Sequence, residues 1–136
     1  MGELGFVELE LDLSLLCSVE EELETSRVSE VGPGIVGHVI TSGETYMAPD
    51  APHDLYFDPS VDRAPGYVVN SLLCAPVIGT QGRAIGAVQL CNKVRDRRQQ
   101  VRVTESFEKS DMRVLSILCS VLGPTLERQL LLDRDQ

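Results

Sequence analysis

The sequence predicts an α/β fold of the α+β kind, in which antiparallel strands pack against a C-terminal helix. Residues 72–78 and 84–90 are two short apolar runs that flank the turn Gly79-Thr80-Gln81-Gly82. Each run is too short for an ordinary helix and rich in β-branched residues, which favours a buried antiparallel hairpin. Residues 6–15 alternate apolar and polar as a half-buried strand does. Residues 108–122 repeat with helical periodicity and supply the helix.

Length and composition limit the classes of protein to which the chain can belong. The 136 residues suffice for one domain and not for two, and the 43% apolar and 24% charged residues are ordinary for a globular protein. A formal net charge of −9 argues against a nucleic-acid polymer as partner, because such binding needs a basic surface. No apolar run has the ~18 residues typical of a membrane span, and no basic region begins a secretory signal. We therefore expect a cytoplasmic protein without a membrane partner.

The cysteines predict neither disulfides nor a metal site. The chain has four cysteines, which lie far apart in the sequence and form no C-x-x-C pair: Cys17, Cys74, Cys91 and Cys119. Three of them lie inside apolar runs. We expect reduced thiols in the core of a cytosolic protein.

The N-terminal third offers two strands. The strand over residues 6–15 should have one solvated face. Ser18-Val19-Glu20-Glu21 could be a capping box that opens a short helix, whereas residues 27–31 alternate like a strand. We expect a turn and then a strand over residues 26–31.

The next segment contains a glycine motif, G-x-G-x-x-G, over residues 32–37. A dinucleotide-binding loop is disfavoured because Pro33 removes one N–H from the loop, and Gly43 stops the following helix after residue 42. The same glycines fit a turn before a short helix over residues 35–41. Residues 46–49 then form a short strand.

Residues 50–70 are rich in Pro, Asp and Gly and cannot form one regular element. Segments of this kind are usually functional, although a passive crossover between strands is the alternative. Asp50, Asp54, Asp58 and Asp62 recur every four residues, but the odd spacing and the central glycine of a calcium loop are absent. Short helical turns and solvated acidic turns are expected here.

The C-terminal third predicts a solvated loop over residues 94–105 and a helix over residues 108–122. Gly123-Pro124 should interrupt or kink this helix, and residues 126–133 should continue it. The predicted buried stripe is Met112, Leu115, Leu118, Cys119 and Leu122, broadened by Val114, Ile117 and Val121. Leu126, Leu130 and Leu131 then remain exposed, which predicts a homodimer through helices; the alternative is that Gly123-Pro124 folds the last segment back onto its own domain.

No catalytic set is evident. The two histidines, His38 and His53, have no nucleophile at a known motif, and a pairing of Cys91 with His38 is the weakest of the hypotheses. We expect a protein that is not an enzyme and that holds no metal or resident cofactor.

Several segments together resemble a GAF domain, most of all the regulatory GAF domains of cyclic-nucleotide phosphodiesterases and certain adenylyl cyclases. The matching segments are residues 34–39, 49–51, 58–62, 73–77 and 85–93. The Asn-Lys, Phe and Asp of that family's motif are matched at Asn92, Lys93, Phe107 and Asp111, whereas its final Glu is Met112. The resemblance implies a mainly antiparallel central sheet with helices on its faces, and a structural ion pair between Lys93 and Asp111.

The resemblance also implies the domain layout: one GAF-like domain over residues 1–136. Residues 1–31 would be divergent or truncated N-terminal strands, and residues 124–136 a C-terminal helical extension. Residues 50–70 would form a lid over a ligand pocket.

Ligand contacts follow from the same resemblance. They are Ile35, Val36, Asp62, Val69 and Gln89. Pro65 and Val69 stand where cyclic-GMP binders carry threonine, and Asp58 stands where an aromatic contact occurs, so cyclic nucleotides should bind weakly or not at all.

The function implied is a regulatory, small-molecule-sensing GAF module of the cyclic-nucleotide phosphodiesterase type, with a cyclic nucleotide as the possible ligand. The alternative is a ligand-free dimerisation or protein-interaction module with a degenerate pocket.

Overall fold

The computed structural model describes residues 6–12, 24–28, 34–59, 69–94 and 104–134. These residues form a five-stranded sheet in the order β2-β1-β5-β4-β3. β1 runs parallel to β5, and the other neighbouring pairs are antiparallel, so the predicted mainly antiparallel sheet is confirmed. The strands are β1 (Phe6–Asp12), β2 (Glu24–Val28), β3 (Tyr46–Ala48), β4 (Leu72–Ile78) and β5 (Ala84–Cys91).

The β4–β5 hairpin forms where the two apolar runs predict it. Its turn is closed by the N–H of Gly79, which donates to the carbonyl of Arg83 at 2.8 Å, and by the N–H of Gly82, which donates to the carbonyl of Gly79 at 3.0 Å. Gly82 has a φ of 80°, a conformation that costs glycine little because it has no Cβ. The register shifts between Val77 and Ile78, which indicates a bulge before the turn.

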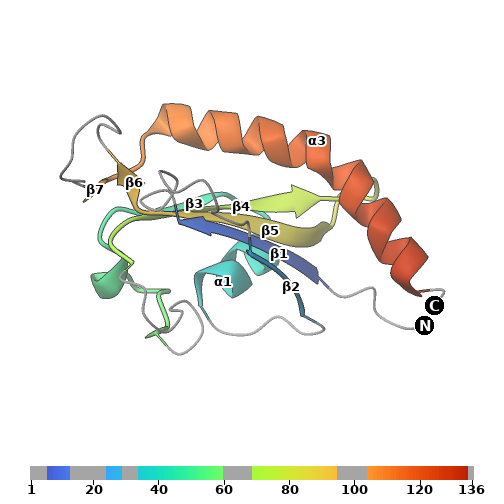
Figure 1. The fold of residues 1–136 in the computed structure, drawn as a ribbon, viewed down its shortest axis with the longest axis horizontal. Coiled ribbons are helices and arrows are strands. Elements are labelled where there is room, and N and C mark those ends of the chain that lie inside the picture. Colours follow the sequence, from blue (N-terminus) through green and yellow to red (C-terminus); the bar gives the residue numbers. More distant parts are fainter. Residues whose placement is uncertain (1–5, 13–23, 29–33, 60–68, 95–103, 135–136) are drawn as a thin grey trace.

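Helices cover both faces of this sheet. Figure 1 shows α3 (Lys109–Arg134) along one face and α1 (Ile35–Ser42) on the other. Successive strand residues point to opposite faces, so strands that are apolar throughout can serve two cores. The α3-side core includes Leu73, Ala75, Val77, Ile85 and Val88. The α1-side core includes Ile35, Val39, Leu72, Cys74, Ala87 and Cys91.

α1 agrees with its prediction. It ends at Ser42 and is capped by Gly43, which has a φ of 72° and whose N–H donates to the carbonyl of Val39 at 2.8 Å. β3 follows, and the 3-10 helix η2 (Ala51–His53) is one of the short helical turns expected in residues 50–70. Residues 60–68 of the predicted lid lie outside the described residues.

The two N-terminal strands form as predicted, although the predicted ends at residues 15 and 31 lie outside the described residues. β1 starts at Phe6 as expected and is described as far as Asp12, whereas β2 starts at Glu24, two residues earlier than predicted, and is described as far as Val28. The pairing explains this start, because Glu24 opposes Glu10 in the antiparallel register with β1. The capping box at Ser18 falls outside the described residues.

The expected loop over residues 94–105 is wrong at both ends. Lys93–Val94 forms β6 and Thr104–Glu105 forms β7, and the two pair as an antiparallel ribbon. The hydroxyl of Ser71 donates to the carbonyl of Glu105 at 2.8 Å and anchors this ribbon to the chain before β4. Charge alone gave no sign of such short strands.

α3 is one helix through Gly123 and Pro124 rather than two. It changes direction along its length in Figure 1, so the predicted kink is found and the alternative interruption is not. A proline inside a helix removes one backbone hydrogen bond and crowds the carbonyl four residues earlier, which bends the helix.

The faces of α3 also differ from the prediction. Leu115 and Cys119 are buried as expected, but Leu130, predicted to be exposed, is 1% exposed and belongs to the α3-side core. The residues predicted to broaden the buried stripe are exposed instead, together with one residue of the stripe itself. This outer face of α3 consists of Val114, Ile117, Leu118 and Val121.

Candidate functional site

Gln89 is the polar residue that stands out on the α1 side of the sheet. It lies on β5 between Ala87 and Cys91, which share its face by strand alternation and belong to the α1-side core. Gln89 is 3% exposed, and its Nε2 donates to Cys91 Sγ at 3.8 Å. Its Oε1 is buried without a hydrogen-bond partner among the described residues. A buried acceptor left unpaired costs roughly 1–3 kcal/mol, so this atom calls for a donor.

A row of residues leads from Gln89 to the sheet edge. Gln89 is opposite Cys74 on β4, and Cys74 is opposite Tyr46 on β3, so the three positions share one face. The Tyr46 hydroxyl donates to Asp54 Oδ2 at 2.8 Å, and the N–H of Tyr56 donates to Asp54 Oδ1 at 2.9 Å. Burial, reinforced by the hydrogen bond to Asp54, raises the pKa of Tyr46 to about 12. The tyrosine therefore stays protonated and keeps donating to this carboxylate.

Three aromatic rings fix residues 54–57 against α1 and β3. The rings of His38 and Tyr56 are stacked, with centroids 3.7 Å apart and planes 13° from parallel. The Tyr46 ring meets both edge-on, at 5.2 Å from His38 and 5.3 Å from Tyr56. Sequence reasoning missed this cluster because its members are 8 to 18 positions apart and follow no period.

The predicted ligand residues that are described gather on this same side. Ile35 and Val69 are buried within the α1-side core, and Val36 is half-buried against it. Their side chains offer apolar packing rather than polar recognition. Asp58 is half-buried. Asp62 and Pro65 lie outside the described residues.

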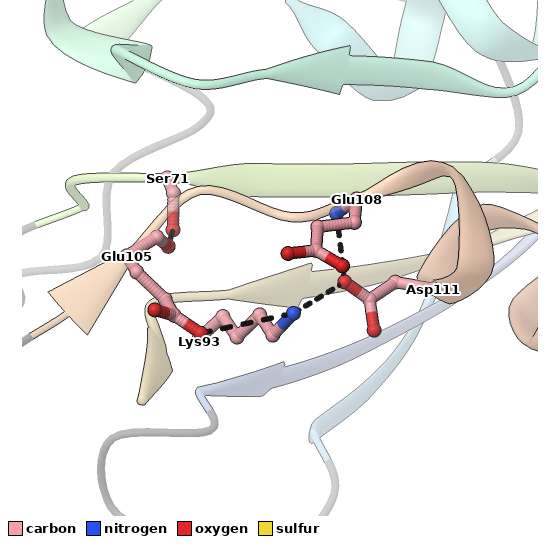
Figure 2. A network of polar contacts seen from close by, with 5 residues as sticks. All are labelled: Ser71, Lys93, Glu105, Glu108 and Asp111. Atoms are coloured by element: carbon pink, nitrogen blue, oxygen red, sulfur yellow. Dashed lines mark hydrogen bonds and ion pairs between the residues drawn. The ribbon is translucent and has the colours of Figure 1, made fainter. Parts of the chain in front are cut away.

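Two of the motif residues, Lys93 and Asp111, belong to a polar network at the start of α3 (Figure 2). Lys93 Nζ lies 2.8 Å from Asp111 Oδ2, which is the ion pair that the sequence predicts, and 3.8 Å from Glu105 Oε1. The N–H of Glu108 donates to Asp111 Oδ2 at 2.7 Å. The hydrogen bond to Asp111 raises the pKa of Lys93. Partial burial opposes ionisation of Asp111, but the hydrogen bonds from Lys93 and Glu108 outweigh it and lower its pKa.

Asn92 extends this network toward the α1 side. It has a φ of 60°, and its N–H donates to the carbonyl of Ser71 at 2.8 Å. Its Oδ1 accepts the N–H of Asn70 at 2.7 Å, and the carbonyl of Asn70 accepts the N–H of Ala51 at 2.9 Å. Phe107 is buried in the α3-side core. The motif therefore joins the end of β5, the start of α3 and the beginning of η2.

The described thiols suit packing rather than chemistry. Cys74, Cys91 and Cys119 are buried thiols. Burial raises the pKa of Cys119 to about 11, so its thiol stays protonated at neutral pH. Within the described ranges, no three side chains of the metal-binding types lie close enough to hold an ion. Cys17 is outside those ranges.

A groove of about 360 Å³ lies between α3 and the end of β4 that continues beyond its pairing with β3. Its hydroxyls already have partners: Thr45 Oγ1 is 3.5 Å from Ser116 Oγ, Ser120 Oγ donates to a carbonyl of its own helix, and Thr80 Oγ1 donates to Glu127 at 2.6 Å. These groups do not call for a ligand in the way that Gln89 does. The candidate site is therefore placed at Gln89.

Known proteins resemble this chain along most of its length. A statistical model of the GAF domain family matches residues 6–126. The chain is 34% identical over 121 residues to dual 3',5'-cyclic-AMP and -GMP phosphodiesterase 11 of Drosophila melanogaster. It is 36% identical over 92 residues to phosphodiesterase 11A of Takifugu rubripes, a dual enzyme of the same description. The matches cover 88% and 68% of this chain but only 8% and 9% of the two relatives.

Solved structures share the fold. A GAF domain structure superimposes with a TM-score of 0.53 at 17% identity, covering 76% of this chain and 50% of that one. A type II free methionine-R-sulfoxide reductase from Thermoplasma acidophilum gives a TM-score of 0.52 at 17% identity, covering 77% and 63%. Identities this low establish the fold alone. Taken with the family match over residues 6–126, they lead to one conclusion: the chain belongs to the GAF domain family.

Proposed function

We propose that this chain is a regulatory, small-molecule-sensing GAF module of the cyclic-nucleotide phosphodiesterase type. The observation that carries the proposal is the buried Gln89 Oε1, which has no donor among the described residues. A ligand that supplies the donor removes a penalty of roughly 1–3 kcal/mol. This gain in binding free energy adds to the gain from the surface that the ligand buries.

Regulation rather than catalysis fits the described chemistry. The thiol of Cys119 is protonated, and the ring of His38 packs against the rings of Tyr46 and Tyr56. The phosphodiesterases that the chain resembles are more than ten times its matched length, which leaves the reaction to their other parts. Buried cysteines that are not joined in disulfides suit a reducing, cytoplasmic location.

Cyclic nucleotides are the first ligands to test, and we expect weak binding. Val69 is buried among apolar side chains and offers no hydroxyl where the family's cyclic-GMP binders have one. Asp58 adds a carboxylate to the segment that follows η2. Each hydrogen bond lost to a charged group costs about 1.5–3 kcal/mol. The loss of two such bonds, from the hydroxyls missing at Pro65 and Val69, moves a micromolar site toward the millimolar range.

A thermal-shift screen tests the sensing function. The ligands are cyclic AMP, cyclic GMP, their nucleosides and small amines, and any ligand at 100 times its Kd stabilises by ~2.7 kcal/mol. Gln89→Leu should abolish the ligand-induced shift without lowering the melting temperature of the free protein. Ser120→Ala, in the groove beside α3, is the control and should leave the shift intact. A screen without any shift, or a shift that survives Gln89→Leu, contradicts the proposal.

A second candidate function is dimerisation, and the outer face of α3 favours it. Ile117 is 63% and Val121 is 68% exposed, and with Val114 they follow the 3–4 spacing of a helix-pairing seam. Lys109–Leu132 is also long and apolar enough to cross a membrane, with a mean hydropathy of 1.2 in its most apolar window. Core helices pass the same test, and Leu115 and Leu130 pack against the sheet. We therefore propose that the outer face of α3 packs against a second copy of the chain.

Sedimentation of the intact chain tests this second function. The chain should be a dimer, and the double variant Ile117→Glu, Val121→Glu should be a monomer with an unchanged fold. Ending the chain at Gly123 is a poorer test, because it removes Leu130 from the core. A wild-type chain that stays monomeric at high concentration contradicts the proposal.

A further inference from the structure

The strand beside Gln89 is acidic on alternate positions. The parallel register between β1 and β5 pairs Glu8 with Ala87, Glu10 with Gln89 and Asp12 with Cys91. Strand alternation places these β1 positions on the same face of the sheet as Gln89. The apolar alternates of β1, such as Leu9, are paired with residues of the α3-side core instead.

The segment that supplies the layer over this face is also acidic. Its described residues, 34–59, contain no Lys or Arg and four carboxylates, which gives a formal charge of −4 with histidine neutral. The four are Glu44, Asp50, Asp54 and Asp58. This segment contains α1, β3 and η2. One sign of charge concentrated around a partly enclosed face attracts ligands of the opposite sign and repels those of the same sign.

We propose that the site at Gln89 takes a small organic cation with N–H donors, such as an ammonium or guanidinium compound, rather than an anionic cyclic phosphate. The inference rests on the proposed function, because it names the ligand class for the same site. Two independent observations support it: the unpaired acceptor needs a donor, and the surrounding positions are acidic. Gln89 Nε2 is already engaged with Cys91, so the acceptor is the atom left for the ligand.

The physical chemistry of the cation favours this pairing. An N–H on a charged group makes a shorter and stronger hydrogen bond to an amide oxygen than a neutral N–H does. The Asp54 carboxylate and the rings of Tyr46 and Tyr56 lie on the same side of the sheet as Gln89. Carboxylates and aromatic faces are the groups that stabilise organic cations in proteins.

Calorimetric titration with agmatine, which carries both a guanidinium and an ammonium group, tests the inference. Cyclic AMP is titrated in parallel. Agmatine should bind more tightly than cyclic AMP, and its affinity should fall about tenfold or more in Gln89→Leu, the loss of one charge-assisted hydrogen bond. Glu10→Gln should weaken agmatine severalfold. Raising the salt concentration from about 50 to about 300 mM should weaken it as well.

The control separates a site from general attraction to a protein of charge −9. Glu108→Gln removes one charge at the start of α3, on the far side of the sheet from α1, and should leave agmatine binding unchanged. Equal losses in Glu108→Gln and Glu10→Gln overturn the inference. Glu10→Gln keeps the test decisive if Gln89→Leu does not fold.

The remaining outcomes distinguish this inference from the proposed function. If cyclic AMP binds more tightly than agmatine and its binding disappears in Gln89→Leu, the proposal of a cationic ligand is overturned, whereas the proposed sensing site at Gln89 is supported. If agmatine fails to bind at millimolar concentration, the proposal of a cationic ligand is overturned. The ligand screen decides separately whether any molecule is sensed.

Discussion

Asn92 shows how a single residue can hold several segments together. Its φ of 60° lies in the left-handed region, which asparagine tolerates better than other residues with a Cβ. This backbone turn ends β5 and lets the side chain accept the N–H of Asn70, while the next residue, Lys93, reaches Asp111. Glycine would adopt the turn without the hydrogen bond, and alanine would provide neither. The residue type follows from geometry rather than from ligand chemistry.

The ion pair between Lys93 and Asp111 should stabilise the domain measurably. The two side chains are 22% and 30% exposed, between the surface pairs that contribute up to ~1 kcal/mol and the buried pairs whose disruption costs ~3–5 kcal/mol. Lys93→Met and Asp111→Asn should each cost about 1–2 kcal/mol in urea unfolding. The double variant should cost less than the sum of the two. Additive losses would show that the pair contributes no coupling.

The same pair predicts how stability depends on pH. The pKa of Asp111 is lowered in the fold, so its contribution is present above the ordinary aspartate pKa and is lost as the pH falls through the lowered value. The pKa of Lys93 is raised, so its contribution is present below the ordinary lysine pKa and is lost as the pH rises through the raised value. The difference in unfolding free energy between wild type and Asp111→Asn should therefore be flat from about pH 5 to pH 10. It should shrink in acid.

At the scale of elements, the approach of α3 to the hairpin depends on Gly123. A Cβ at this position would meet the backbone carbonyl oxygen of Ile78 at 2.5 Å. Backbone cannot move aside as a flexible side chain can. The glycine thus lets the helix cross the end of β4 closely, one residue before Pro124 bends it.

Gly123→Ala should destabilise the domain although alanine is the better helix former. Propensity alone favours alanine by ~1 kcal/mol, whereas a clash with rigid backbone costs ~1–3 kcal/mol. Thermal unfolding should give a lower melting temperature than wild type. Thr125→Ala, exposed on the same helix, is the control and should be neutral or slightly stabilising. A Gly123→Ala protein more stable than wild type would mean that the helix can move away from β4.

Periodicity predicts the elements well and their orientation less well. The β4–β5 hairpin, α1 and β3 follow from short apolar runs and glycine stops, which are local signals. Leu130 shows the limit: it lies eleven residues after the buried Cys119, close to three turns of helix, so it falls on the buried face of α3, but how far the sheet-facing core continues along the helix is a tertiary property. The β6–β7 ribbon pairs residues ten and twelve positions apart and is joined to Ser71 by a hydrogen bond, which no local pattern contains.

The candidate site shows the same division. The family resemblance points to Gln89, but its unpaired Oε1 becomes evident only when the surrounding core is seen. Ile35 and Val69 are placed on the correct side of the sheet by the resemblance, and their burial in the core is a tertiary property. The ring cluster joins His38 on α1, Tyr46 on β3 and Tyr56 in the turn after η2, and because these positions follow no period, the sequence contains no signal for it.

At the scale of the whole molecule, the two sheet faces divide the tasks. The α1 side combines a buried acceptor with acidic positions, and the α3 side presents an exposed apolar face to the outside. The polar network at Lys93 lies where β5 meets α3 (Figure 2). The proposed ligand site and the proposed dimer interface therefore lie on opposite faces, and we expect salt to affect the two in opposite directions.

Self-association through the outer face of α3 should strengthen with salt. Two copies of a chain with formal charge −9 repel each other at low ionic strength, whereas burial of Ile117 and Val121 against a partner is not screened. Sedimentation equilibrium should therefore give a dimer Kd that falls severalfold between about 50 and about 500 mM sodium chloride, at which the Debye length shrinks from ~14 to ~4 Å. The double variant Ile117→Glu, Val121→Glu should stay monomeric throughout. A dimer that dissociates as salt is added would instead be held by ion pairs, and the apolar face would not be its interface.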